Sequence, residues 1–65
     1  MNPSIQRIII GKTEAEAIAI LSQFGCNWRI AFRNKEQEQN LTKDRDDRRY
    51  NLVMQNGKVQ RVFAG

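Results

Sequence analysis

The fold of this chain is decided by the stretch YNLVMQNGKVQRVF, residues 50–63. Apolar and polar residues alternate before Asn56-Gly57 and again after it, which is the pattern of two strands with one face on a core. Asn and Gly both tolerate the positive φ that a two-residue hairpin turn requires, so this dipeptide is the strongest short signal for such a turn. The sequence therefore predicts a β-hairpin in its C-terminal part.

The turn also predicts which residues face each other across the hairpin. A two-residue loop gives two apolar pairs on one face, Met54 with Val59 and Tyr50 with Phe63. The same register sets Leu52 opposite Arg61, an apolar residue opposite a charged one. Either Arg61 extends its charge to solvent at a sheet edge, or a bulge shifts the pairing, and the sequence leaves both open.

A third strand is predicted at WRIAFR, residues 28–33. Trp28, Ile30 and Phe32 alternate with the other residues, as in a strand with one face on a core. We assign the two aromatic residues to the core and not to a base-stacking surface, because one Trp, one Tyr and three Phe leave few aromatic residues to spare. The long connection that follows allows this strand to pair in parallel with the hairpin.

One helix is predicted from Thr13 to Phe24. Thr13 and Glu16 have the spacing of a capping box, in which each side chain bonds the backbone of the other residue. Gly25 suits the left-handed position that ends a helix. The apolar run at residues 8–10 is expected to pack under this helix. Four apolar residues follow the cap at the spacing of one buried helix face: Ala17, Ile20, Leu21 and Phe24.

Together these elements predict an α+β fold, because a helix packs on only one face of so small a sheet. We expect a single domain over residues 1–65, in which one helix packs on a small mixed sheet, with a long exposed binding loop and a C-terminal β-hairpin. A chain of 65 residues buries only about 60% of its unfolded surface, so it has a small core and no room for a deep catalytic cleft.

The composition argues against catalysis and metal binding. The chain has no histidine, the commonest general base and metal ligand, and Cys26 is its single cysteine. A lone cysteine beside Gly25 lacks the activating neighbour that a nucleophile needs. We therefore expect no enzyme activity, no metal and no cofactor. Because the sequence shows neither a signal-peptide pattern nor an apolar run of membrane-spanning length, we also expect a cytoplasmic protein.

The charge of the chain is basic but dispersed. Its 11 Lys and Arg residues and 7 Asp and Glu residues give a formal net charge of +4, and the acidic residues interrupt the basic ones. This dispersal favours a solvated surface over nucleic acid binding, for which we expect at most a weak affinity. The densest charged stretch is KDRDDRR, residues 43–49, which is either solvent filler or a presented binding surface.

Several segments resemble a known family in the same order along the chain. IGKTEAEA at residues 10–17 is similar to the V-G-K-S-x-E-E-A opening of the potato inhibitor I family of serine-protease inhibitors. Thr42-Lys43-Asp44 is similar to the T-x-D/E at the reactive bond of that family, and Arg49 falls on an arginine that braces the reactive loop. Residues 49–65 resemble the R-L-N-V…G-x-I-x-x-V-x-C-G ending of the related bacterial I78 inhibitors, with Ala64 in place of the cysteine.

This resemblance implies a protein that inserts an extended loop into a protease cleft as a substrate would. Lys43 would occupy the specificity position and Asp44 would follow the scissile bond, which implies a trypsin-like target with an acidic pocket floor. Such inhibition depends on a loop held in its bound shape before docking. The implied reactive-loop residues are Leu41, Thr42, Lys43, Asp44 and Arg45. The implied loop-bracing residues are Asp46, Asp47, Arg48, Arg49 and Asn51.

Two alternatives remain open at this point. The family carries a second arginine where this chain has Asn51, and the charges at Asp46 and Arg48 are exchanged relative to the family. If the register slips by one, Arg48 takes the place of Arg49 and Thr42 is presented instead of Lys43. The same fold is also compatible with a non-inhibitory protein-binding module. Under either hypothesis we expect a monomer whose partner is another protein.

Overall fold

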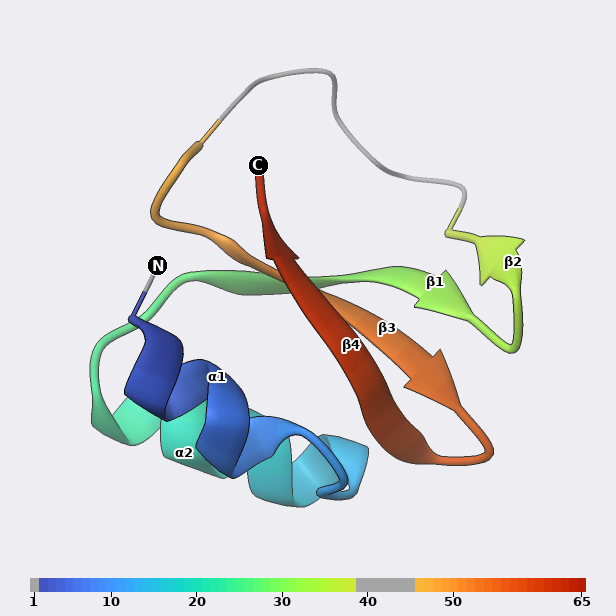
Figure 1. The fold of residues 1–65 in the computed structure, drawn as a ribbon, viewed down its shortest axis with the longest axis horizontal. Coiled ribbons are helices and arrows are strands. Elements are labelled where there is room, and N and C mark those ends of the chain that lie inside the picture. The colour runs from blue at the N-terminus through green and yellow to red at the C-terminus, as the bar shows by residue number, and fades with distance from the viewer. Residues whose placement is uncertain (1, 39–45) are drawn as a thin grey trace.

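A computed structural model describes residues 2–38 and 46–65. Within these residues the chain forms two helices and one mixed sheet of four strands, in the order β2-β1-β3-β4. Both helices pack on the same face of the sheet, which leaves the other face without a helix (Figure 1). The predicted α+β class is confirmed. The elements are α1 (Pro3–Ile9), α2 (Glu14–Gln23), β1 (Trp28–Arg33), β2 (Glu36–Gln37), β3 (Tyr50–Gln55) and β4 (Lys58–Ala64).

The predicted helix is α2, and its start has the predicted capping box. The Glu16 backbone N–H donates to Thr13 Oγ1 at 3.3 Å, and the Thr13 backbone N–H donates to Glu16 Oε1 at 3.1 Å. Gly25 follows the helix with a φ of 67°, as expected for the residue that ends it. One detail is wrong: Phe24 is 57% exposed, because it is the C-cap residue and lies beyond the turn that faces the sheet.

The prediction of a single helix is also wrong, because α1 precedes α2 and packs beside it (Figure 1). Asn2 caps α1 by accepting a hydrogen bond from the Ser4 backbone N–H at 2.8 Å, and Pro3 occupies the first helical position. Ile5 and Ile9, one turn apart, are buried against the sheet. Of the apolar run at residues 8–10, only Ile9 therefore faces the core, while its two neighbours are exposed.

The sheet joins distant parts of the chain. β1 pairs with β3 in parallel, which the long connection allows, and β3 pairs with β4 in an antiparallel hairpin through Asn56-Gly57. β2 lies in the segment that the sequence assigned to a loop, and it pairs antiparallel with β1. Asn34 and Lys35 form the turn before it, with φ values of 52° and 70°.

A β-bulge in β4 determines which residues pair across the hairpin. Met54 faces Val59 as predicted, but the register shifts between Val53 and Met54. Leu52 therefore faces Val62 instead of Arg61, and Arg61 faces Val53 on the opposite side of the sheet. The predicted pair of Tyr50 and Phe63 is wrong for the same reason: Tyr50 faces Ala64, and Phe63 faces Asn51.

A second bulge, which lies in β1, makes the predicted core position of Phe32 wrong. Ile30 pairs with Leu52 and Phe32 pairs with Val53, so Ala31 is an additional residue in β1. The extra residue keeps Trp28 and Ile30 against the core but turns Phe32 to the opposite face of the sheet, where it lies beside Val53. The buried core between the helices and the sheet contains Ile5, Ile9, Ala17, Leu21, Tyr50, Leu52, Met54, Val59 and Val62.

The outer edge of β4 is bonded to the N-terminal part of the chain. The Gly11 backbone N–H donates to the Val59 oxygen, and the Val59 N–H donates to the Lys12 oxygen, both at 2.8 Å. Gln6 Nε2 also donates to the Val62 oxygen at 3.3 Å. These bonds occupy backbone groups that an added strand would otherwise pair with.

Candidate functional site

The predicted reactive-loop residues Leu41, Thr42, Lys43, Asp44 and Arg45 lie outside the described residues. The structure instead places the two segments that flank them, which are the chain after β2 and the chain before β3 (Figure 1). These two flanking segments mark where the chain leaves the sheet before the predicted loop and where it returns to the sheet.

The first flanking segment is held to β1 and α2. The Glu38 backbone N–H donates to the Ala31 oxygen at 3.0 Å. The Arg33 guanidinium lies between two carboxylates, with Nη2 2.7 Å from Glu14 Oε1 and Nε 3.0 Å from Glu38 Oε1. Hydrogen bonds to Glu14 and then Glu38 raise the pKa of Arg33. Because these groups are about half exposed, the ion pairs add little stability, although they connect the chain after β2 to β1 and α2.

The second flanking segment is a turn organised by Asp46. The Arg48 backbone N–H donates to Asp46 Oδ1, and the Arg49 N–H donates to the Asp46 backbone oxygen, both at 3.0 Å. Asp side chains commonly stabilise turns in this way, by bonding the backbone two residues further on. Asp46 thus directs the chain into β3. Arg48 and Asp47 are exposed, and Arg48 lies beside Cys26 and Tyr50 at the other end of β1.

A polar cluster lies directly after this turn, and we call it the Asn51 cluster: Arg29, Arg49, Asn51 and Gly65. Asn51 Nδ2 donates to the Gly65 oxygen and to the Phe63 oxygen, each at 3.0 Å. Arg49 donates to the same Gly65 oxygen from Nε at 3.0 Å and from Nη2 at 2.9 Å. Arg29 Nε donates to Asn51 Oδ1. The Gly65 oxygen therefore accepts three hydrogen bonds, and two of them come from one guanidinium.

The strand register explains why these residues meet. Arg29 and Phe63 are the direct neighbours of Asn51 on the two adjacent strands, and direct neighbours share one face of a sheet. Asn51 is 0% exposed, and its amide matches this position because it supplies both a donor and an acceptor. A buried polar side chain without partners would destabilise the fold. Because the Asn51 amide can make all three of its bonds in only one orientation, the cluster fixes that orientation.

The cluster contains some of the predicted bracing residues and excludes others. Arg49 and Asn51 are brought together, whereas Arg48 lies elsewhere. Arg29 and Gly65 were not among the residues predicted to brace the loop. A signal for Arg29 was present, because the alternation of β1 sets it on the side opposite Trp28 and Ile30. No local pattern indicated that the chain near Gly65 returns to this place.

Comparisons of the chain with protein-family models, with curated proteins and with solved structures found no significant match. Across residues 2–38 and 46–65, no group of three His, Cys, Asp or Glu side chains is arranged to hold a metal ion. No helix in this part of the chain has the length and apolar character that crossing a membrane requires.

Proposed function

We propose that this protein is a serine-protease inhibitor that presents the segment around Lys43-Asp44 to a trypsin-like protease. The observation that supports this function best is the position of Arg49. In the family that the chain resembles, an arginine at this place braces the reactive loop. Here Arg49 lies at the base of the predicted loop and donates twice to the Gly65 oxygen within the Asn51 cluster.

The mounting of the loop is consistent with this mechanism. The segment before the predicted loop is hydrogen-bonded to β1 through Glu38, and the segment after it forms the Asp46 turn directly before β3. A chain segment whose two ends are held has fewer accessible conformations than a free segment of the same length. A loop restricted before docking loses less entropy when it binds, which favours tight and slowly cleaved complexes.

The position of Arg49 also favours one of the two registers. A slip of one residue would require Arg48 to take the bracing position, but Arg48 is exposed and lies beside Cys26 and Tyr50. The register with Arg49 as the bracing residue presents Lys43, and a lysine at the specificity position fits a pocket with an acidic floor.

The primary test is a titration of trypsin, chymotrypsin and subtilisin with the wild-type protein and with Lys43→Ala. We expect wild-type protein to inhibit trypsin and Lys43→Ala to weaken inhibition by about 100-fold or more, as for a central interface residue. Lys35→Ala is the matched control, because it removes an equal charge from the described β1–β2 turn. Rapid cleavage after Lys43 without loss of trypsin activity would contradict the proposal. Inhibition that depends on Thr42 instead of Lys43 would indicate the slipped register.

A second test examines the bracing role. Arg49→Ala is expected to remain folded but to be cleaved by trypsin faster than wild-type protein, as followed by mass spectrometry of the intact chain. Arg48→Ala is the control, since it removes the same charge from an exposed position. Equal cleavage rates for both variants would show that Arg49 has no special role in the loop. A chain that neither inhibits nor is cleaved would favour the alternative, a non-inhibitory protein-binding module.

A further inference from the structure

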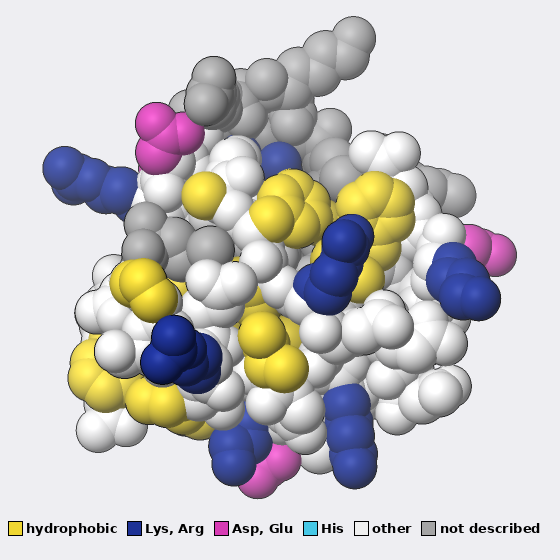
Figure 2. All heavy atoms as spheres, in the orientation of Figure 1, with side chains coloured by type: hydrophobic (Ala, Val, Ile, Leu, Met, Phe, Trp, Pro, Cys, Tyr) yellow, Lys and Arg dark blue, Asp and Glu magenta, His cyan; other side chains and the backbone are white. Residues whose placement is uncertain are grey.

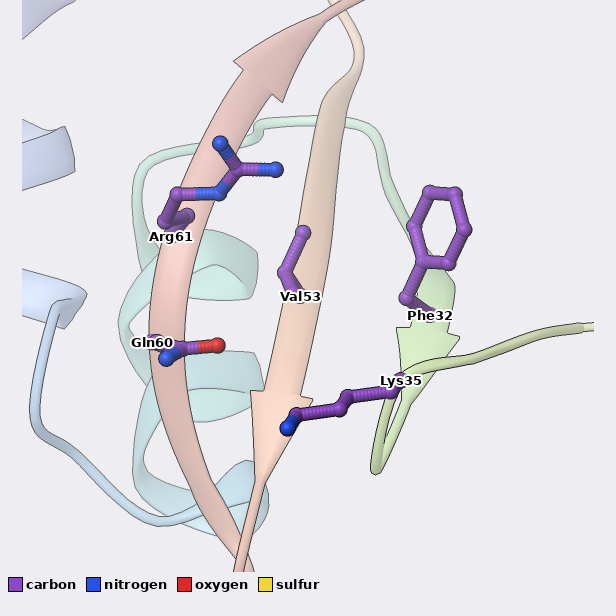
Figure 3. Close-up of a pocket in the computed structure, with 5 residues that line it drawn as sticks. All are labelled: Phe32, Lys35, Val53, Gln60 and Arg61. Atoms are coloured by element: carbon purple, nitrogen blue, oxygen red, sulfur yellow. The ribbon is translucent and has the colours of Figure 1, made fainter.

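The face of the sheet opposite the helices carries aromatic and basic side chains. Asn51 and Val53 of β3 lie on this face, and their direct neighbours on the adjacent strands share it. Those neighbours are Arg29 and Phe32 of β1 and Arg61 and Phe63 of β4. In Figure 3 the helices lie behind the sheet, and the side chains of this face stand in front of it.

A hollow of about 360 Å³ lies on this face, lined by Phe32, Lys35, Val53, Gln60 and Arg61. Figure 3 shows Val53 between the Phe32 ring on one side and the Arg61 guanidinium on the other, with Lys35 and Gln60 toward one end. The hollow has an apolar floor, two planar groups at its sides and polar groups at its end. Its volume is in the range of small-molecule sites, which is roughly 300 to 1,000 Å³.

Both β-bulges contribute to this hollow. The extra residue in β1 turns Phe32 away from the core, and the extra residue in β4 sets both Gln60 and Arg61 against Val53. Without the bulges, strict alternation would direct Phe32 to the helix side. Bulges are frequent near functional sites, where they redirect side chains in this way.

The charges around the hollow have one sign. Lys35 and Arg61 line it, and none of the described residues that line it is acidic. Among the described residues, the salt bridges of Glu14 and Glu38 are made to Arg33 and not to Lys35 or Arg61. In the view of Figure 2, Lys and Arg side chains lie next to apolar ones over the strands, while the visible Asp and Glu side chains lie near the outline. The hollow therefore attracts an anionic ligand.

We propose that this face binds single-stranded nucleic acid, with one base stacked on Phe32 in the hollow, a second base on Phe63, and phosphates paired with Lys35 and Arg61. Exposed aromatic rings on an open sheet beside cations are the usual means of binding single strands, because every base has a face that can stack. Phe63 is 39% exposed and lies on the strand that carries Arg61. The Gln60 amide can donate to and accept from the edge of a base.

An acidic peptide fits the same observations less well. An extended peptide usually adds to a free sheet edge, but β4 bonds at Val59 to the segment between α1 and α2. A peptide also has no need for one exposed and one half-buried aromatic ring beside a planar guanidinium. The dispersed charge of the sequence gave no indication of this arrangement, because the sheet brings together cations that lie far apart along the chain.

Fluorescence anisotropy tests the proposal with labelled oligothymidylate and oligouridylate of about twelve nucleotides, which covers typical site sizes. We expect binding at low salt, with log K falling with log salt at a slope of about −1.4 for two phosphate contacts. Phe32→Ala should weaken binding by about tenfold or more, and Phe32→Tyr should restore it. Arg61→Ala and Lys35→Ala should each reduce the slope by about 0.7.

Matched controls lie on the helix side of the molecule. Phe24→Ala removes an exposed aromatic ring there, and Arg7→Ala removes a cation from the last turn of α1. Neither should change affinity beyond the small effect of net charge. If Phe32→Ala does not fold, Phe63→Ala and the two cation variants test the same face.

Three results would overturn the proposal: no anisotropy change at low salt, equal losses for Phe24→Ala and Phe32→Ala, or displacement of the oligonucleotide by polyglutamate at equal charge concentration. The last result would identify a site that responds to charge alone, as an acidic protein partner would require. The proposal is independent of protease inhibition, so Phe32→Ala is expected to inhibit trypsin as wild-type protein does.

Discussion

Replacing Asn51 with alanine is expected to destabilise the protein by about 3 kcal/mol. The amide of Asn51 donates to the Phe63 and Gly65 oxygens and accepts from Arg29 Nε. Each such bond contributes about 1 kcal/mol net, and a bond to a charged partner contributes somewhat more. The Gly65 oxygen keeps its two bonds from Arg49, so the loss falls mainly on the Phe63 oxygen and on Arg29.

That loss is large for a chain of 65 residues, whose total stability at a typical 0.05 to 0.15 kcal/mol per residue is about 3 to 10 kcal/mol. Asn51→Asp tests the effect of the lost hydrogen bonds without a change in side-chain volume. It keeps the size of the side chain and an acceptor for Arg29, but it sets an oxygen where Nδ2 donates to the Phe63 and Gly65 oxygens. We expect it to be destabilised at least as much as Asn51→Ala.

Urea unfolding at neutral pH, followed by the fluorescence of Trp28, measures this effect. Trp28 is the single tryptophan and packs against the core, so its emission reports on unfolding. Asn27→Ala is the control, because Asn27 is exposed and its replacement should change stability by less than about 0.5 kcal/mol. If Asn51→Ala stays within that range, or if Asn51→Asp is as stable as wild-type protein, then the Asn51 cluster does not stabilise the fold as argued.

Three further outcomes concern the turns and caps. Thr13→Ala removes the N-cap of α2 and should lower the free energy of unfolding by about 1 kcal/mol in the same urea assay. Gly57→Ala should cost about 1 to 2 kcal/mol through backbone strain alone, since φ is 78° and no atom of the described residues lies within 4 Å of the added methyl. Gly57→Asn should cost less, because Asn tolerates a positive φ better than Ala does. Hydrogen bonds from the Thr13 backbone and then its hydroxyl lower the pKa of Glu16 below its ordinary value of 4.5. The stability that this carboxylate contributes is therefore present above pH 4.5 and lost as the pH falls through the lowered pKa. The melting temperature of Glu16→Gln should therefore depend less on pH in acid than that of wild-type protein.

The elements with a complete local signal could be predicted from the sequence. α2 has both members of its capping box and a glycine after its end, and the turn at Asn56-Gly57 lies between two alternating runs. α1 was missed because three consecutive isoleucines obscure the helical period of Ile5 and Ile9. Its start was nevertheless marked, since Asn2 and Pro3 are favoured residues at those positions. β2 has two polar residues and no periodic pattern, so only its pairing with β1 defines it.

The candidate site was predictable only in part. Arg49 lies directly before β3 and two residues before Asn51, and the family resemblance drew attention to both. Their partners could not be found in the same way, because Arg29 comes from another strand and Gly65 arrives beside them through the hairpin. Contacts of this kind depend on the order and register of the strands, which local sequence does not determine.

The two bulges could not be predicted from local sequence either. They explain why the sequence did not indicate the aromatic and basic face of the sheet opposite the helices. A single inserted residue reverses every later side chain, so strict alternation assigned Phe32 to the core and set Leu52 against Arg61. With the bulges in place, the core loses one aromatic ring, and the opposite face gains Phe32 beside a cation from another strand. The side chains that this protein presents are therefore determined by two local irregularities more than by its composition.

The two proposals can be separated by variants of different residues. Lys43→Ala should impair protease inhibition, and Phe32→Ala should impair binding of single strands by about tenfold or more. Neither variant should strongly affect the activity that the other one tests.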